Sequence, residues 1–333
     1  MEVDGHSRVP VSLIVTVRND RRGFAELLDG IAVQTEMPDE LVVVDGGSDD
    51  GTLQELEARR AGLPPLRVLV APGANIAAGR NIAVREASHD WIACTDAGCR
   101  PVPGWLAALK AARARGDIAA GTFVVEAETP LDRAVACAHY PLLEEVDEED
   151  PLVRISHRLF GRNFRPEHAG GRSMAFSRAA WEEVGGFPEH VYAGEDLAFS
   201  AAAIERGFSP TLVEEAAVYW RPRTSWLATA AMFATYTRGD VRTKGRGRHL
   251  ARLAAWSAGP VLIVRGGIAG RLLAGAGVAA YLWLPMRRAR RSLSAGEWWR
   301  VPLLVIVKDL AQLGGAGMGL VDAARGVSQP PPR

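Results

Sequence analysis

The sequence predicts an α/β fold in which a mostly parallel sheet is flanked by helices, and three observations support this. Short apolar runs rich in branched residues recur through the first hundred residues. Segments with apolar residues at helical spacing separate these runs. Two of the runs end directly in an aspartate, at Asp45 and Asp96. Strands and helices that alternate at such short spacing are typical of βαβ units, and parallel sheets bind ligands beyond the carboxyl ends of their strands.

The expected elements follow from these runs in chain order. Strands are predicted at residues 11–17, 41–44, 66–70, 91–95 and 211–219, and helices at 22–33, 52–61, 76–87, 178–184 and 195–206. Residues 141–168 interrupt the alternation, because they contain the acidic run EEVDEED and many turn-forming residues. We predict that the acidic run EEVDEED (144–150) is a solvated loop.

The C-terminal third differs in charge from the rest of the chain. The formal net charge is zero, yet residues 221–333 contain 18 Lys and Arg against 4 Asp and Glu. Apolar stretches at 250–264, 272–286 and 301–307 alternate with arginines, and none reaches the roughly 18 uncharged residues of a confident membrane-spanning helix. This pattern favours a helical region on an anionic membrane surface, and leaves open whether its helices span the membrane or lie on it. The alternative is a packed helical appendage with surface arginines.

Other classes of partner and compartment are disfavoured. The basic residues alternate with apolar blocks and no groove-reading motif is present, so we expect no nucleic acid partner. The three cysteines, Cys94, Cys99 and Cys137, are odd in number and form no CxxC pair, which indicates a reducing compartment. The first residues lack a basic and then apolar leader, so no secretory signal is expected.

Each chemical motif also has a purely structural interpretation. Asp45 lies in DGGSDDGT, which could be a turn with Ser48 or Asp49 capping the next helix. The pair Glu195–Asp196 could be two acids favoured at a helix start by the helix dipole. The glycines of GGRSMAF (170–176) could form a turn or let the backbone approach a ligand.

The order and spacing of the motifs resemble those of glycosyltransferase family 2, in its membrane-associated subgroup. The resemblance covers residues 11–240 and rests on VSLIVTVRND, ELVVVDGGSDDGT, ANIAAGRNIAV, WIACTDAGCRPVPGWL, GGRSMAFSRAAWEEVGGFPEHVYAGED and MFATYTRGD. It implies the GT-A fold, which binds nucleotide-sugars, with a C-terminal helical region.

The resemblance also implies a donor site. The aspartate after the second strand reads the nucleotide base in this family, and Asp45 matches it. The other implied donor contacts are Thr16, Arg18, Asn19, Arg80, Asn81 and Asp96. The family holds a divalent cation, Mg²⁺ or Mn²⁺, on an Asp-x-Asp motif, and Asp96 matches its first aspartate. Here the motif reads Asp96-Ala97-Gly98, so its last carboxylate is missing. One carboxylate still suffices for Mg²⁺ beside phosphates and waters.

The catalytic residues implied by the resemblance are Asp196 and Glu195, with Asp196 as the base that deprotonates the acceptor hydroxyl. Contacts with the acceptor or the diphosphate are implied for Gly171, Arg172, Ser173, Tyr236 and Arg238. The stretch FATYTRGD (233–240) lacks the Gln-x-x-Arg-Trp motif of many membrane-bound synthases. This departure argues against a processive polysaccharide synthase.

These expectations combine into one hypothesis. Residues 1–225 form a GT-A-like domain, 226–325 a membrane-associated helical region, and 326–333 a disordered tail. The protein is expected to move a sugar, with inversion, from a nucleotide-diphospho-sugar to a hydroxyl acceptor, lipid-linked or in a cell-envelope glycan, at the cytoplasmic face of the membrane. This makes it a hexosyltransferase-type enzyme. The alternative is a non-catalytic nucleotide-sugar-binding scaffold of the same fold.

Overall fold

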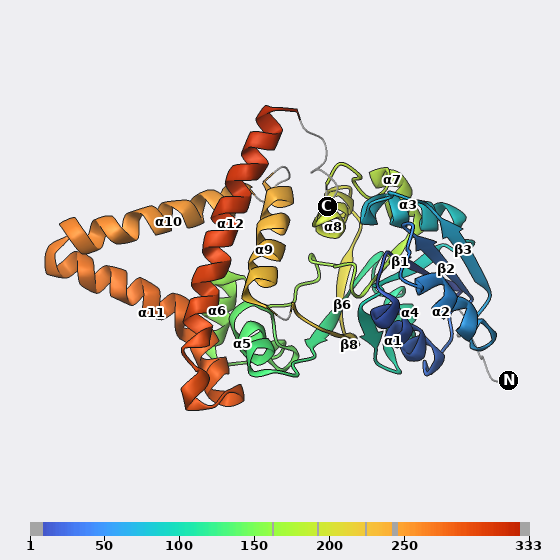
Figure 1. The fold of residues 1–333 in the computed structure, drawn as a ribbon, viewed down its shortest axis with the longest axis horizontal. Helices are drawn as coiled ribbons and strands as arrows, with labels where there is room; N and C mark the ends of the chain where they lie inside the picture. The colour runs from blue at the N-terminus through green and yellow to red at the C-terminus, as the bar shows by residue number, and fades with distance from the viewer. Residues whose placement is uncertain (1–8, 162, 192, 224, 242–245, 327–333) are drawn as a thin grey trace. The chain divides into compact units, whose positions relative to one another are not determined.

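The computed structural model describes residues 9–161, 163–191, 193–223, 225–241 and 246–326. The chain divides into two compact units, which are described separately (Figure 1). The first unit comprises Met1–Val124, Phe164–Glu189 and Glu195–Trp220, and the second comprises Val125–Asn163, His190–Gly194 and Arg221–Arg333. The division therefore assigns residues 125–163 to the second unit, whereas the sequence predicted a single boundary near residue 225.

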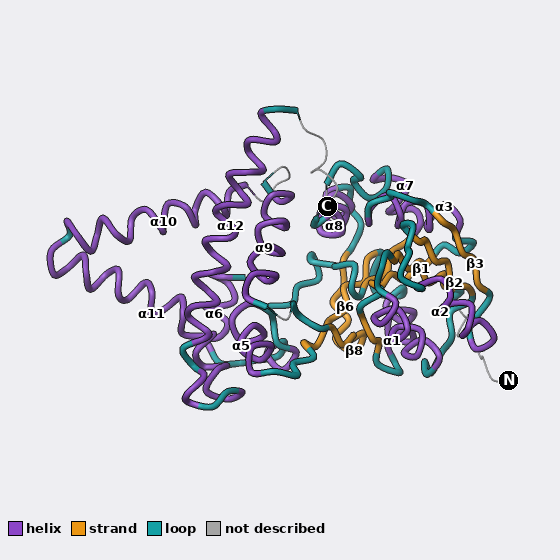
Figure 2. Tube along the Cα trace, in the orientation of Figure 1, coloured by secondary structure: helices purple, strands orange, loops and turns teal. Residues whose placement is uncertain are grey.

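An eight-stranded sheet forms the centre of the first unit (Figure 2). The strand order is β3-β2-β1-β4-β7-β6-β8-β5. The strands are β1 (Val11–Val17), β2 (Glu40–Asp45), β3 (Leu66–Val70), β4 (Trp91–Asp96), β5 (Cys99–Pro101), β6 (Ile118–Val125), β7 (Met174–Ser177) and β8 (Pro210–Trp220). All five strands predicted from the sequence are present.

The sheet is mixed. Strands β1 to β4 pair in parallel, and their register places Asp45 beside Val17 and Asp96 beside Thr16. The two predicted ligand-binding aspartates therefore lie at the same edge of the sheet, separated by β1. Strand β7 pairs antiparallel with β4 and β6, and β5 pairs antiparallel with β8. In this half the sequence predicted β8 and missed β5, β6 and β7. Strands β5 and β7 have only three and four residues, too few to show a clear two-residue periodicity.

Two hydrophobic cores cover the two faces of the sheet. The helices of this unit are α1 (Arg21–Ala32), α2 (Thr52–Arg59), α3 (Ile76–Glu86), α4 (Trp105–Ala112), α7 (Arg178–Val184) and α8 (Glu195–Glu205). Helix α1 buries Leu27 and Leu28 in one core, and α3 buries Val84 in the other. Helix α1 begins where Asp20 Oδ1 accepts the backbone N–H of Gly23, which satisfies one free donor of the first turn.

The second unit is helical. Its helices are α5 (Pro130–His139), α6 (Pro151–Phe160), α9 (Trp226–Asp240), α10 (Arg246–Arg265), α11 (Gly267–Ser292) and α12 (Arg300–Ala324). Helix α9 packs along α12, and α10 and α11 form an antiparallel hairpin (Figure 1). Gly267–Ser292 and Ala295–Ala324 are long and apolar enough to cross a membrane, by length and composition alone. Only 11% and 28% of the 18-residue apolar windows of these two segments are buried, so most of each window is uncovered.

The predicted solvated loop at the acidic run 144–150 is largely confirmed, because residues 146–150 are irregular and partly or fully exposed. A helix follows it within the segment 141–168. Helix α6 occupies part of this segment, because Asp150 Oδ1 accepts the N–H of Leu152 and Pro151 occupies the first helical position. Within the acidic run, Glu145 is buried because Arg288 and His157 bind its carboxylate. The predicted tail lies outside the described residues except for Gly326.

Candidate active site

The turn after β2 is organised around Asp45. Its side chain is fully buried, and its Oδ1 accepts the backbone N–H groups of Gly47 and Ser48, both at 2.8 Å. The Ser48 hydroxyl donates to Asp45 Oδ2 at 2.5 Å. Gly47 has a φ of +89°, a conformation that glycine adopts without a steric cost. The carboxylate therefore builds the turn as well as standing at the predicted ligand edge.

Asn19 ties this turn to the end of β1. Its N–H donates to Ser48 Oγ at 2.9 Å, and its Oδ1 accepts the N–H of Asp49 at 2.9 Å. Neither Ser48 nor Asp49 caps α2, because its N-cap residue is Gly51 and no side chain bonds there as a cap. Asp50 Oδ1 accepts the N–H of Thr52 at 3.0 Å, while Asp49 contributes its backbone N–H to Asn19.

A buried charge cluster lies beside β4. Arg80, on α3, donates from Nη2 to Asp96 Oδ1 at 2.7 Å and from Nη1 to Glu195 Oε1 at 2.5 Å. The Phe187 ring centroid lies 5.6 Å from the Arg80 Cζ atom, which adds a cation–π contact. A Cβ atom at Gly171 would come within 1.9 Å of Arg80 Nη2, so this position accepts only glycine while Arg80 keeps its place. The structure thus joins three motifs that are far apart in the sequence.

Asp196 lies at the edge of this cluster in the first turn of α8. Its Oδ2 accepts the N–H of Gly171 at 2.7 Å, and its Oδ1 accepts the N–H of Leu197 at 2.8 Å. The side chain is half-buried, whereas its neighbour Glu195 is buried. The Asp196 carboxylate is therefore fixed in orientation and still partly exposed to solvent. A general base needs both properties to accept a proton from an incoming hydroxyl group.

The cluster contains more acids than cations. Burial raises the pKa of Glu195 to about 7, and the Asp196 carboxylate adds to this rise, while Arg80 opposes it. Burial alone would lower the pKa of Arg80, but the acids around it, Asp96, Glu195 and Asp196 among them, raise it well above its ordinary value. One permanent cation thus faces three carboxylic acids, and burial raises the pKa of one of them, Glu195.

The nearby thiol is unsuited to nucleophilic catalysis. Cys94 is buried and its Sγ lies 3.8 Å from the carbonyl oxygen of Gly171. Burial raises the pKa of Cys94 to about 12, so the thiolate that would attack an electrophile does not form at neutral pH.

Several other predicted site residues have structural partners. The Asn81 amide makes four hydrogen bonds: it donates to Glu189 Oε1 and the carbonyl of Phe187, and accepts from the indole of Trp181 and the N–H of Phe187. Asn81 therefore shapes the GGF turn next to Arg80. This bonding uses the full capacity of the amide.

The GGRS stretch divides between backbone and side-chain roles. Ser173 is buried, where its hydroxyl donates to the carbonyl of Ala216 at 2.7 Å and accepts from the indole of Trp105 at 2.8 Å. The Arg172 guanidinium stacks on Trp220, with Cζ 4.2 Å from the ring centroid. Within this stretch the Arg172 side chain is partly exposed, whereas the Ser173 side chain is buried.

The remaining predicted residues lie in two places. Thr16 is half-buried at the end of β1 and Arg18 is exposed just beyond it. Tyr236 and Arg238 belong to α9 of the second unit. There Arg238 forms a paired contact with Asp322, at 2.5 and 3.0 Å. The proposed contacts of these residues with acceptor or diphosphate stay predictions.

Comparison with known proteins decides the family. Residues 12–176 match the model of glycosyl transferase family 2. The chain carries a family 2 glycosyltransferase domain. Glycosyltransferase AglE of Haloferax volcanii is 25% identical over 210 residues, which cover 62% of this chain and 64% of that protein. The chain thus spans less than two thirds of this curated relative.

A solved structure gives the fold of the glycosyltransferase domain. The mannosyltransferase PcManGT from Pyrobaculum calidifontis, in complex with GDP-Man and Mn²⁺, has a TM-score of 0.59 at 20% identity and covers 92% of this chain and 88% of its own. The family match and this likeness confirm the predicted GT-A fold and the recognition of the family.

The residues of the glycosyltransferase domain supply only some of the ligands that a divalent cation needs. Among the residues that the structure describes, no group of three or more His, Cys, Asp or Glu side chains could hold a metal ion. Asp96 Oδ1 accepts a hydrogen bond from Arg80, but the Asp96 side chain is 39% exposed, so part of the carboxylate is accessible. These residues fit a cation that arrives with a diphosphate and takes its remaining ligands from phosphate and water.

The sequence interpretation of the glycosyltransferase domain missed Phe187 and Glu189. Both contact residues that the motifs did identify, Phe187 through the Arg80 guanidinium and Glu189 through the Asn81 amide. Both lie in the quoted GGFPEH stretch, Phe187 as the last residue of GGF, but no role was assigned to either residue.

Proposed function

We propose that the protein transfers a hexose with inversion from a nucleotide-diphospho-sugar to a hydroxyl acceptor. The observation that carries this proposal is the oriented, partly exposed Asp196 carboxylate beside the Arg80–Asp96–Glu195 cluster. In a single displacement the base lies opposite the leaving group, within hydrogen-bond reach of the attacking hydroxyl. The cluster supplies a base and a fixed cation within one site.

Asp45 is assigned to the nucleotide base. A carboxylate has about four acceptor positions, and the turn uses three of them. The Asp45 side chain is fully buried. An N–H group of the nucleotide base therefore reaches its carboxylate only if the turn moves or if the hydrogen bond from the Ser48 hydroxyl breaks. Thr16, Arg18 and Asn19 at the end of β1 are assigned to the same donor pocket.

The transfer step is assigned to Asp196 and Arg80. Asp196 takes the proton of the acceptor hydroxyl through its carboxylate, which the Gly171 N–H keeps in place. Arg80 balances negative charge beside the diphosphate, and Asp96 is the ligand available to a divalent cation. When bound, Mg²⁺ or Mn²⁺ supplies charge neutralisation to the leaving diphosphate. The mannosyltransferase is described with GDP-Man and Mn²⁺, which belong to the donor and cation classes proposed for this chain.

The proposed acceptor is lipid-linked or part of a cell-envelope glycan, at the cytoplasmic face of the membrane. The two long apolar helices and the cationic excess of residues 221–333 support membrane association. Contacts of Gly171, Arg172, Ser173, Tyr236 and Arg238 with the acceptor or the diphosphate are part of this proposal.

A non-catalytic nucleotide-sugar-binding scaffold is the second candidate, because Gly98 stands where the family motif has its last carboxylate. The test is a thermal-shift screen of nucleoside diphosphates and their sugars, with and without Mn²⁺, followed by measurement of nucleoside diphosphate release. A ligand-dependent rise in melting temperature with slow release supports the transferase. Binding without any release supports the scaffold, and no binding of any nucleotide contradicts both.

A further inference from the structure

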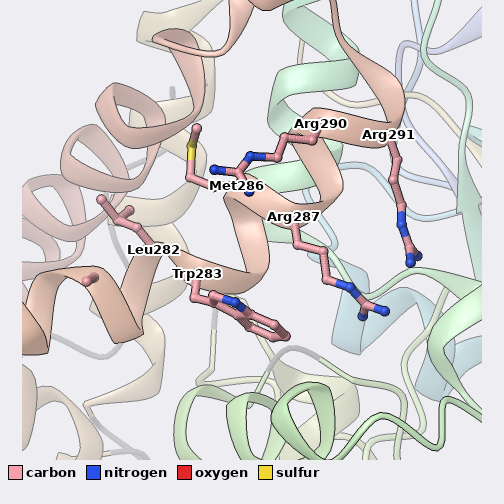
Figure 3. Close-up of a pocket in the computed structure, with 7 residues that line it drawn as sticks. Leu282, Trp283, Met286, Arg287, Arg290 and Arg291 are labelled. Atoms are coloured by element: carbon pink, nitrogen blue, oxygen red, sulfur yellow. The ribbon is translucent and has the colours of Figure 1, made fainter.

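One face of α11 changes from apolar to basic along the helix axis. Residues four apart in a helix lie above one another, so this face consists of two adjacent rows. One row is Leu282, Met286 and Arg290, and the other is Trp283, Arg287 and Arg291 (Figure 3). We call these six residues the α11 stripe. Both rows run in the same direction, apolar first and arginine last.

The α11 stripe lines a surface groove of about 590 Å³. Leu282, Trp283 and Met286 are only partly covered, and Arg290 and Arg291 are exposed. From Leu282 to Arg290 is eight residues, or about 12 Å along a helix. Such a length connects the outer hydrocarbon of a bilayer to its headgroup layer.

The arginines of the stripe differ in their partners. Arg287 pairs with Glu148 at 3.0 Å and with Asp150 at 3.4 Å, so its charge is already balanced. Arg290 lies over the Trp298 ring, with 5.8 Å from Cζ to the centroid. In the described part of the chain, neither Arg290 nor Arg291 has a carboxylate partner. Arg290 and Arg291 thus end the two rows without a carboxylate partner in the described residues, and their side chains point to different sides of the helix (Figure 3).

We propose that the α11 stripe binds anionic phospholipids of the bilayer, with Arg290 and Arg291 each on a headgroup phosphate and Leu282 and Met286 against the acyl chains. Guanidinium groups match phosphate oxygens in geometry and charge, and the apolar row removes hydrocarbon from water. The inference rests on the proposed membrane association and names the lipid chemistry and the residues of contact. A free phosphate would leave the apolar row without a ligand.

The test is partitioning of the full-length protein onto sedimenting vesicles of phosphatidylcholine alone or with 30 mol% phosphatidylglycerol. The double variant Arg290→Gln/Arg291→Gln removes both charges. Its matched control, Arg60→Gln/Arg325→Gln, removes two exposed arginines elsewhere. Each arginine near an anionic surface contributes roughly 1 kcal/mol, so the stripe variant is expected to partition about 30-fold more weakly onto the anionic vesicles. The control is expected to lose less than about threefold.

Two further measurements keep the outcomes separate. Arg290→Lys/Arg291→Lys keeps both charges and is expected to retain binding, which excludes misfolding of the helix as the cause. Inorganic phosphate at 10 mM, with ionic strength held constant, is expected not to displace the protein. Equal weakening by the stripe variant and its control, or displacement by phosphate, would overturn the stripe assignment while leaving membrane association intact. Failure of the unaltered protein to bind any vesicle would instead overturn membrane association itself.

Discussion

Among the described residues, each compact unit contains one arginine that is almost completely buried, and the two arginines have very different surroundings. Arg80 in the first unit binds Asp96 and Glu195, with Asp196 adjacent. Arg288 in the second unit binds both oxygens of Glu145, at 2.9 and 2.5 Å. The clusters are similar in burial and in ion-pair distance. They differ in their balance of charge.

The balance of charge sets opposite pKa shifts. In the second unit burial would raise the pKa of Glu145, but hydrogen bonds from His157 and Arg288 outweigh it and hold the pKa at about 2. In the first unit burial and the neighbouring Asp196 raise the pKa of Glu195 to about 7 despite Arg80. A satisfied ion pair stabilises the fold, whereas a cluster with surplus acid holds protons near neutral pH. The comparison teaches that burial of charge alone does not identify a working site.

The largest expected effect is on catalysis. Asp196→Asn keeps the size and the Gly171 contact of the side chain but removes the base, so turnover is expected to fall by about 10²–10⁴-fold with donor binding nearly unchanged. Asp150→Asn is the matched control, because Asp150 also accepts a backbone N–H at a helix start. Steady-state turnover and calorimetric donor binding measure both variants. Normal turnover of the Asp196 variant with a lower melting temperature would make Asp196 a helix-start charge only.

The second prediction concerns the stability of the balanced cluster. Because the pKa of Glu145 is below its ordinary value of 4.5, its ion pairs stabilise the fold above pH 4.5, and this contribution is lost as the pH falls towards 2. Glu145→Gln is expected to lower the free energy of unfolding by about 3 kcal/mol at pH 7, with a difference that shrinks in acid. Chemical denaturation at pH 7, 4 and 3 measures this, with Glu148→Gln as control. A difference independent of pH would contradict the assignment.

The third prediction concerns Asp45. Asp45 is completely buried and accepts three hydrogen bonds, so an alanine there would also cost stability. Asp45→Asn is the milder change, and we expect about tenfold weaker nucleotide binding from the loss of a charged acceptor. Asp50→Asn alters the same turn outside the donor edge and serves as control. Equal affinities of the two variants in calorimetry would remove Asp45 from the donor site.

The sequence predicted the parallel half of the sheet well, because its strands are long apolar runs separated by amphipathic helices. It also placed Asp45, Asp96 and the Glu195–Asp196 pair in the correct elements. It could not predict that Arg80 joins Asp96 to Glu195, because that contact spans 115 residues and depends on how α3 packs. For the same reason the sequence could not predict that Arg288, 143 residues away, binds Glu145. Glu145 was therefore interpreted as part of a solvated loop.

The most direct test of the account is Glu195→Gln, measured for both turnover and stability across pH 5 to 8. Since the pKa of Glu195 is raised to about 7, the unaltered protein loses stability as the pH rises from 4.5 through 7. A neutral glutamine avoids that loss, so the variant is expected to gain stability relative to the unaltered protein at pH 8 while turnover falls at least about tenfold. The opposite result is a lower melting temperature, as expected for Glu145→Gln, with unchanged turnover per folded molecule. That result would show that the Arg80 cluster is only a second structural ion pair.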